Sequence, residues 1–125
     1  MNKRIVTSSE TAPPGGPFSP GVEIDGWLYL SGQVGQDPKT GKLVEGDITR
    51  QMEQLLRNVE AVLKAGGRTF SHVIQARVFL ADMGDFAAMN TVYTKYFQPP
   101  YPARTTVAVK SLPLGAAVEM DVIAR

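Results

Sequence analysis

Residues 47 to 65 carry apolar side chains at helical spacing, and the residues around them mark where a helix begins and ends. Asp47 is a favoured capping residue, and Gly66 and Gly67 form a stop signal. The apolar positions between them recur every three or four residues: Ile48, Met52, Leu55, Leu56, Val59, Val62 and Leu63. Such a helix has one apolar stripe, so we expect it to pack against a second layer of structure.

A second helix is expected from about Asp85 to Phe97. Its apolar and aromatic side chains share one stripe: Phe86, Met89, Tyr93, Tyr96 and Phe97. Pro99, Pro100 and Pro102 follow directly, and proline cannot continue a helix because it lacks the backbone N–H. The chain therefore supplies two amphipathic helices.

Strand patterns occupy much of the remaining chain. The Asp25-Gly26 pair favours a type I′ hairpin, because both central residues of that turn need a positive φ. Apolar alternation predicts strands at residues 3–7, 22–30 (in two arms), 73–80, 104–110 and 118–124. The order β-β-β-α-β-α-β-β predicts an α+β fold, and 125 residues fit one domain spanning 1–125.

The same alternation sorts the strand residues onto two faces of a sheet. One face is apolar and should lie beneath the helices: Leu28, Leu30, Ile74, Ala76, Val78, Leu80, Val107, Val109, Val118, Met120 and Val122. The other face is mixed: Trp27, Tyr29, Ser31, Gln75, Arg77, Phe79, Arg104, Thr106, Glu119, Asp121 and Ile123. This mixture suits a subunit interface that contains a site. A solvent-facing sheet with scattered ion pairs is the alternative.

Composition excludes several classes of function. Thirteen basic and twelve acidic residues leave a formal charge of +1, so the chain lacks the basic excess of a nucleic-acid-binding domain. There is no cysteine and only one histidine, His72, which leaves too few parts for a Ser-His-Asp triad or a Cys/His zinc site. Position and neighbours favour a surface or capping role for His72. No apolar run approaches membrane-spanning length and no signal peptide is visible, so a cytoplasmic location is expected.

Two strand residues on the mixed face could carry chemistry. Arg104 follows a proline-rich turn, and a guanidinium offers paired donors that match a carboxylate. Glu119 lies mid-strand, and Asp121 follows it on the same face, so the two carboxylates could divide acid and base roles. An interface ion pair with Arg77, Arg104 or Lys110 is the simpler interpretation of these acidic residues.

The sequence resembles the Rid (reactive intermediate deaminase, YjgF-type) family along essentially its whole length. The signature region is PARTTVAVKSLPLGAAVEMDVIA, residues 102–124. GPFSPGV (16–22), LYLSGQVGQDPKTGKLV (28–44) and ADMGDFAAMNTVYTKYF (81–97) follow the family pattern in the same order. The resemblance implies a chorismate-mutase-like fold, with a six-stranded mixed sheet and two helices on one face. It also implies a homotrimer with ligand sites between subunits.

The implied reaction is hydrolysis of enamine and imine intermediates, such as 2-aminoacrylate from serine, to 2-keto acids and ammonia. A protonated imine is already electrophilic, so no metal or organic cofactor is expected. The partner molecule would be a small imine, enamine or keto acid bearing a carboxylate. By resemblance, Arg104 binds that carboxylate and Glu119 positions the attacking water. A nearby Arg104 would then depress the pKa of Glu119.

The remaining implied site residues are Gly32 and Thr106, which line the pocket through backbone contacts, and Phe18 and Asn90 at pocket-associated positions. Two of them depart from the usual pattern: Phe18 stands where many members have Tyr, and Thr106 stands where many have Cys. These departures concern substrate range and rate rather than reaction class.

Two other functions remain open from the sequence. A ribonuclease or translation-inhibitor role is attributed to some members of the family, although the near-neutral charge argues against RNA as a partner. A non-catalytic trimer that binds metabolites or acts as a chaperone would need nearly the same residues. Turnover of a freshly generated imine would separate the deaminase from this non-catalytic trimer.

Overall fold

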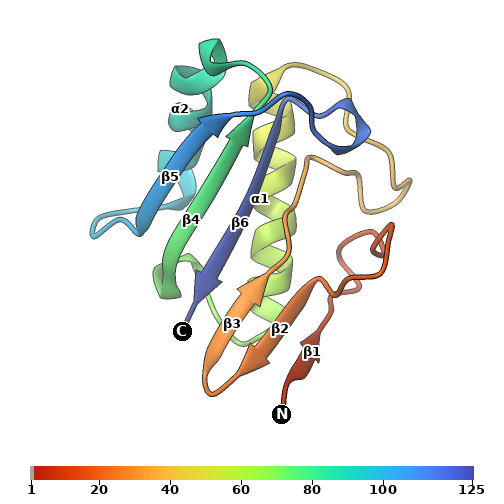
Figure 1. Ribbon diagram of the computed structural model, residues 1–125, viewed down its shortest axis with the longest axis vertical. Coiled ribbons are helices and arrows are strands. Elements are labelled where there is room, and N and C mark those ends of the chain that lie inside the picture. The colour runs from red at the N-terminus through yellow and green to blue at the C-terminus, as the bar shows by residue number, and fades with distance from the viewer. Residues whose placement is uncertain (1) are drawn as a thin grey trace.

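The computed structural model describes residues 2–125, which form six strands in one mixed sheet and two α-helices (Figure 1). Their order confirms the predicted β-β-β-α-β-α-β-β arrangement of an α+β fold. The elements are β1 Arg4–Val6, β2 Gly21–Ile24, β3 Trp27–Leu30, α1 Ile48–Ala65, β4 Val73–Leu80, α2 Phe86–Tyr96, β5 Ala103–Ala108 and β6 Val118–Ala124. Asp25 and Gly26 both have positive φ, as the hairpin prediction requires.

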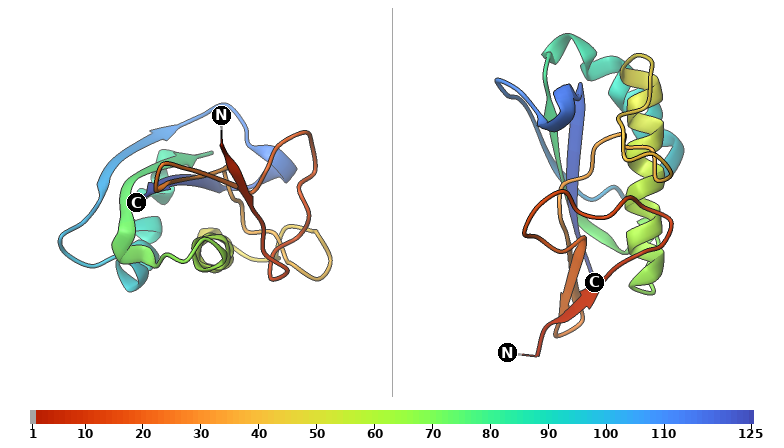
Figure 2. Two further views of the ribbon diagram at one scale, coloured as in Figure 1. Left: turned by 90° about the horizontal axis from the view of Figure 1, so that it is seen from below. Right: turned by 90° about the vertical axis from the view of Figure 1, so that its right-hand side faces the viewer.

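The strand order in the sheet is β1-β2-β3-β6-β4-β5. All neighbouring strands are antiparallel except β4 and β5, which run parallel and are joined through α2. Both α-helices lie on one side of the sheet, and the other side carries no α-helix within the described residues (Figure 2). The C-terminal strand β6 is therefore central, and β5 forms an edge.

The first helix is held as its sequence predicts. The Asp47 carboxylate accepts hydrogen bonds from the backbone N–H groups of Thr49 and Arg50, at 3.1 and 3.3 Å. All seven residues of its predicted apolar stripe are buried against the sheet. Asn58, also buried on α1, donates to the carbonyl oxygens of Val34 and Gln36 and so fixes the segment that follows β3.

The predicted helix-facing surface is correct for β3, β6 and most of β4, but two positions are wrong. Ile74 is 50% exposed, because a β-bulge between Val73 and Gln75 turns two consecutive side chains outward. Val107 is 39% exposed, because it pairs with Phe79 on the face without helices.

The pairing of β5 with β4 also corrects the sequence-based placement of two site residues. Arg104 lies beside Ala76 and Thr106 beside Val78, and both β4 partners are fully buried under the helices. Residues paired across a sheet point to the same side. Arg104 and Thr106 therefore lie on the helix-bearing face, whereas the sequence had placed them on the opposite face with Glu119.

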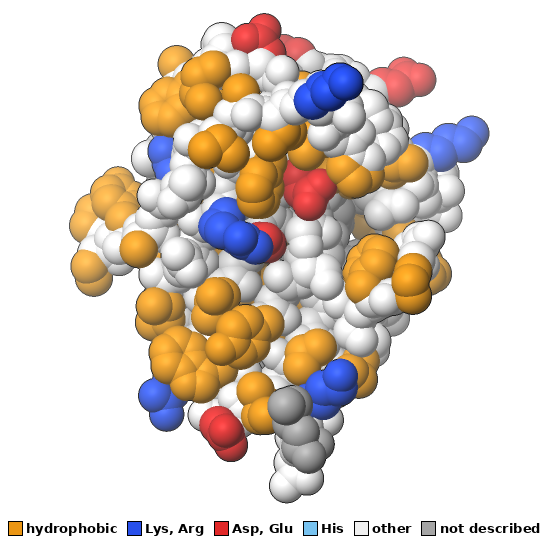
Figure 3. Space-filling view, viewed as in Figure 1, with side chains coloured by type: hydrophobic (Ala, Val, Ile, Leu, Met, Phe, Trp, Pro, Cys, Tyr) orange, Lys and Arg blue, Asp and Glu red, His pale blue; other side chains and the backbone are white. Residues whose placement is uncertain are grey.

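The face without helices is a mixed surface (Figure 3). Hydrophobic side chains gather on it, and acidic side chains are set back among them. Tyr29 and Val107 are 45% and 39% exposed. Arg77 and Asp121 form an ion pair here with nitrogen–oxygen distances of 2.9 and 2.7 Å, as the simpler interpretation of Asp121 predicted.

Neither α-helix of the described residues, 2–125, has the length and hydrophobicity that a membrane-spanning helix requires.

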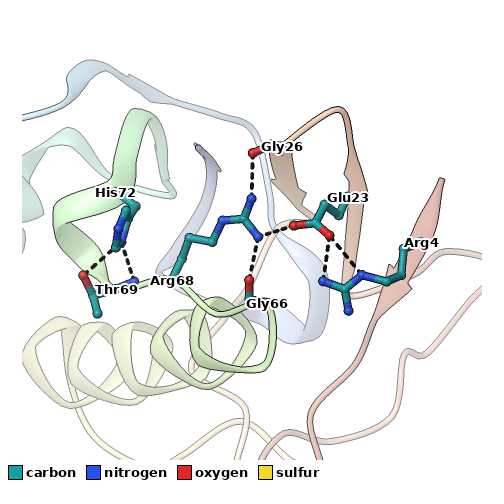
Figure 4. A network of polar contacts seen from close by, with 7 residues as sticks. All are labelled: Arg4, Glu23, Gly26, Gly66, Arg68, Thr69 and His72. Carbon is teal, nitrogen blue, oxygen red and sulfur yellow. Dashed lines mark hydrogen bonds and ion pairs between the residues drawn. The ribbon is translucent and has the colours of Figure 1, made fainter. Parts of the chain in front are cut away.

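A network of polar contacts links β1 and β2, at one edge of the sheet, to the segment that follows α1 (Figure 4). Glu23 accepts hydrogen bonds from Arg68 and Arg4, and these bonds lower the pKa of its carboxyl. Arg68 also donates to the carbonyl oxygens of Gly26 and Gly66, both at 2.6 Å. Nearby, the Nδ1 of His72 accepts from the Thr69 backbone N–H at 3.0 Å, which confirms the capping role expected for this histidine.

Candidate functional site

The Glu119 side chain lines a cavity of about 540 Å³ on the face without helices. The cavity wall combines the loop before β2, the segment after β3 and the turn before β6. It brings together three of the predicted site residues, Phe18, Gly32 and Glu119. Most of the remaining wall is apolar, and it also includes Gly15, Ser31, Gln33 and Gln36. The apolar lining residues were not singled out from the sequence: Ala12, Pro13, Pro14, Pro20, Val34, Pro113 and Leu114.

Backbone pairing places Gly32 against Glu119. Gln33 and Met120 exchange N–H···O bonds of 2.9 and 3.0 Å, so the segment after β3 runs beside β6. A Cβ atom on Gly32 would collide with the Glu119 carboxylate, lying 2.9 Å from its Cδ and closer to Oε2. Glycine at position 32 therefore makes room for the acidic side chain.

The loop that carries Phe18 is anchored to the same segment. The Ser31 hydroxyl donates to the Ser19 carbonyl at 2.6 Å, and the Ser31 N–H donates to the Pro20 carbonyl at 2.9 Å. The Phe18 ring itself is 53% exposed at the cavity rim. The loop is thus fixed while its aromatic side chain stays available to a ligand.

The electrostatic setting of Glu119 favours its protonated form. Burial raises the pKa of the carboxyl, and the neighbouring negative charge of Asp121 raises it further. Within residues 2–125 no basic side chain pairs with Glu119. The expected depression of this pKa by Arg104 is wrong for a single chain, because Arg104 lies on the other face.

Arg104 borders a second, smaller cavity of about 280 Å³ beside α2. Asn90 also lines it, together with Tyr93, Thr94, Tyr101 and Pro102. The Cζ of Arg104 lies 4.7 Å from the centre of the Tyr93 ring and 5.7 Å from that of Phe86. No acidic residue within 2–125 pairs with Arg104, so its charge is free to meet an anion.

The predicted site residues therefore fall into two groups. Phe18, Gly32 and Glu119 share the larger cavity, and Arg104 and Asn90 share the smaller one. Thr106 lines neither, and its buried hydroxyl has no hydrogen-bond partner within the described residues.

Sheet geometry sets the separation of the two groups. Arg104 pairs with Ala76 and Glu119 pairs with Phe79, on opposite sides of β4. From the usual strand spacing and rise, the Cα atoms of Arg104 and Glu119 are roughly 14 Å apart, with side chains on opposite faces. A small imino acid cannot contact both residues of one chain.

Metal ligands are not clustered in this part of the molecule. Across residues 2–125 no three histidine, aspartate or glutamate side chains come together in a way that could hold a metal ion. The charged groups that line the two cavities are the Arg104 guanidinium and the Glu119 carboxyl, whose pKa is raised.

Comparison with known proteins identifies the family. The model of the family described as "Endoribonuclease L-PSP" matches residues 9–125. The chain is 44% identical to protein DfrA of Myxococcus xanthus, over 99% of this chain and 96% of that protein. It is 43% identical to the 2-iminobutanoate/2-iminopropanoate deaminase of the goat, Capra hircus, over 98% and 89%.

Solved structures agree with this assignment. The crystal structure of YEO7 from yeast superimposes with a TM-score of 0.95 at 37% identity, and the match covers 98% of both chains. Sequence and fold thus match this family over nearly the whole chain. The chain therefore belongs to the endoribonuclease L-PSP family, which is the Rid (YjgF-type) family that its sequence resembles.

Proposed function

We propose that this chain hydrolyses small imino acids to 2-keto acids and ammonia, in sites that two subunits of a homotrimer complete together. The observation that carries the proposal is the division of the site residues. Among residues 2–125 of one chain, Arg104 on one face and Glu119 on the other form no ion pair. Each group becomes useful to one small ligand only when a second copy supplies the complementary half.

The Arg104 half provides orientation. The substrate is small, and its carboxylate is its one permanent charge. Two parallel N–H···O bonds from a guanidinium fix both the position and the plane of such a group. Fixing the imine beside a bound water converts an encounter of two mobile molecules into a reaction within one complex, which removes much of the entropic barrier.

The Glu119 half supplies proton transfer. Water adds to the carbon of the protonated imine while Glu119 accepts one proton from that water, and this forms a neutral carbinolamine. Glu119 then returns this proton to the amino nitrogen. As the carbon–nitrogen bond breaks, the carbinolamine hydroxyl gives its own proton to Glu119, and ammonia leaves as the keto acid forms. A carboxyl whose pKa is raised toward the working pH is a better base than an ordinary glutamate, and its conjugate acid still returns the proton.

Relatives support this reaction class. Several proteins about as similar as the goat enzyme carry the name 2-iminobutanoate/2-iminopropanoate deaminase. The arginine, glutamate and glycine that the chemistry needs are present here as Arg104, Glu119 and Gly32. For the present chain we infer 2-aminoacrylate, through its imine tautomer, and 2-iminobutanoate as substrates.

Assembly into a trimer would bury the face that no helix covers. This face carries exposed Tyr29 and Val107 together with partly exposed Trp27, Phe79 and Ile123. Apolar groups of this kind gain free energy when they leave water. Light scattering at micromolar concentration is expected to give three times the mass of one chain, and a monomer at that concentration would contradict the shared site.

A coupled assay tests the reaction. Serine or threonine dehydratase generates the imine, and keto acid release is followed with and without this protein. The wild type is expected to accelerate release, and Arg104→Ala is expected to abolish the acceleration. If the wild type gives no acceleration but binds 2-oxobutanoate, the non-catalytic binding trimer becomes the better account.

The ribonuclease alternative finds little support in the geometry. The one histidine of the chain caps a turn beside β4 and lies in neither cavity. The formal charge of +1 gives no general attraction to phosphates, so nucleic acid is not a proposed partner. The cytoplasmic location expected from the sequence stays a prediction.

A further inference from the structure

The Arg104 side chain is supported by one stripe of α2. Phe86, Asn90 and Tyr93 are spaced i, i+4 and i+7, which places them on one side of the helix. Two of the three are aromatic, and both rings approach the same guanidinium, at 4.7 and 5.7 Å from its Cζ. Asn90 lies between them and lines the cavity beside Arg104.

The Phe86 and Tyr93 rings both lie near the Arg104 guanidinium. Within residues 2–125 no carboxylate pairs with it. A guanidinium within about 6 Å of a ring centre is attracted by the negative face of the ring and can stack on it. Neither ring carries a negative charge, so the positive charge of the guanidinium remains available to an anion.

Tyr93 is itself held firmly. Its side chain is 4% exposed, and its ring stacks on Phe97 with a centroid distance of 4.3 Å. Its hydroxyl has no hydrogen-bond partner within the described residues, and burial raises the pKa of the phenol, with Arg104 acting in the opposite direction. The Tyr93 ring is therefore fixed in the core, and the Arg104 guanidinium lies over it.

We propose that Tyr93 and Phe86 are positioning residues that set the plane of the Arg104 guanidinium before ligand arrives. This inference rests on the proposed role of Arg104 in binding a carboxylate. A long, flexible arginine would otherwise lose its freedom on binding, which weakens affinity. An arginine already ordered by two rings avoids that loss.

Three variants and one control test the rings. Tyr93→Leu and Phe86→Leu remove one ring each, and Tyr93→Phe removes only the hydroxyl. Phe70→Leu is the matched control, because Phe70 packs edge-on against Phe97 and Tyr96 in the same aromatic cluster without approaching Arg104. Phe86 is 39% exposed at the first turn of α2, so its loss should leave the fold intact even where Tyr93→Leu does not.

Calorimetric titration with 2-oxobutanoate is the first readout, and the neutral 2-oxobutanamide is the reference ligand. Each leucine variant of the two rings should weaken 2-oxobutanoate by about threefold to tenfold, the effect of having to order one long side chain on binding. Their binding of the amide should not change. Tyr93→Phe should bind both ligands like the wild type, and Phe70→Leu should lose thermal stability without losing affinity. The proposal would be overturned if Phe70→Leu weakened the binding of 2-oxobutanoate as much as the Tyr93→Leu and Phe86→Leu variants do. It would also be overturned if these two variants weakened the binding of the amide equally.

A ligand-free readout separates this inference from the proposed function. The Nε–H resonance of Arg104, identified by its absence in Arg104→Lys, should show a ring-current shift and restricted motion in the wild type and in Tyr93→Phe. The ring-current shift and the restriction of motion should both be smaller in Tyr93→Leu and in Phe86→Leu. A wild type that binds no 2-oxobutanoate would refute the role of Arg104. A mobile, unshifted Arg104 resonance in the wild type would refute its positioning by the rings.

Discussion

Arg104 and Glu119 lie on opposite faces of one sheet, although both of their strands pair with β4. Arg104 is the lateral neighbour of Ala76, whose side chain is buried under the helices. Glu119 is the lateral neighbour of Phe79 on the uncovered face. A cation and a carboxylate so arranged serve two different sites of one chain, or one site shared between copies. The proposed reaction requires the second arrangement.

Arg104→Ala should reduce imine turnover far more than it reduces stability. Losing a charged partner in a desolvated pair costs about 2–5 kcal/mol, which corresponds to a decrease in activity of well over tenfold. The melting temperature should change little, because Arg104 forms no ion pair within residues 2–125. Arg104→Lys should fail nearly as badly, since an ammonium cannot make the bidentate contact. Unchanged acceleration of keto acid release by Arg104→Ala would refute the proposed role of the arginine.

The pH profile should report the raised pKa of Glu119. If Glu119 acts as a base, activity falls as the pH falls through its pKa, and burial and Asp121 both shift that midpoint upward from where it would lie without them. Asp121→Asn removes one of the two causes of the shift, so the midpoint should move part of the way back. Steady-state rates between pH 4 and pH 8 measure this. If the midpoint did not change in Asp121→Asn, the fall in activity at low pH would belong to the titration of another group.

The same shift has a consequence for stability. Because the folded state raises the pKa of Glu119, folding favours the protonated carboxyl, and this contribution is lost as the pH rises through the folded-state pKa. Glu119→Gln, which stays neutral, should therefore melt at a higher temperature than the wild type at pH 7. The part of the difference that depends on pH should vanish well below the ordinary pKa of 4.5, where the wild-type carboxyl is protonated in both states.

Gly32→Ala should disable the Glu119 half without unfolding the chain. The added methyl would collide with the carboxylate, so Glu119 must leave its position beside the cavity. Gly15→Ala is the matched control, because Gly15 lines the same cavity and a Cβ there meets nothing within 4 Å. Activity should fall in the first variant and persist in the second, with circular dichroism unchanged in both. Equal activity in the two variants would mean that Glu119 tolerates displacement.

Thr106→Val should stabilise the isolated fold. The Thr106 hydroxyl is buried without a partner in residues 2–125, and an unsatisfied buried hydroxyl costs about 1–3 kcal/mol. Valine has nearly the same shape and removes that group. Denaturant unfolding measures the change. A loss of stability instead would mean that a ligand or a neighbouring subunit satisfies the hydroxyl.

The local structure was largely predictable from sequence. Helix α1 begins after Asp47 and ends at Ala65 because capping, apolar period and the Gly66-Gly67 stop all agree there. The bounds of β4 and β6 match their alternating segments, and the hairpin at Asp25-Gly26 follows from its turn residues.

The face assignment of β5 was not predictable by the same reasoning. Val107 and Val109 alternate like core residues, yet Val107 points to the uncovered face, where a second copy would cover it. Alternation says which side chains share a face but not which face that is. The register with β4 decides it, and nothing in the β5 sequence encodes that register. Arg104 and Thr106 were misplaced for this reason.

Part of the candidate site was also beyond sequence reasoning. The resemblance supplied Arg104, Glu119 and Gly32, but the approach of Tyr93 and Phe86 to Arg104 depends on how α2 lies across the sheet. Their i, i+7 spacing was visible as an apolar stripe, and a stripe of that kind is ordinarily core. The contact between helix and edge strand reveals the second role.

Mixing two inactive variants tests the shared site most directly. Arg104→Ala keeps an intact Glu119 half, and Glu119→Gln keeps an intact Arg104 half. The two are unfolded, mixed in equal amounts and refolded, with each variant refolded alone as the control. If every site takes one half from each of two subunits, random assembly restores about a quarter of the sites. Imine hydrolysis near a quarter of the wild-type rate is the predicted result, and a mixture as inactive as its components would contradict the account.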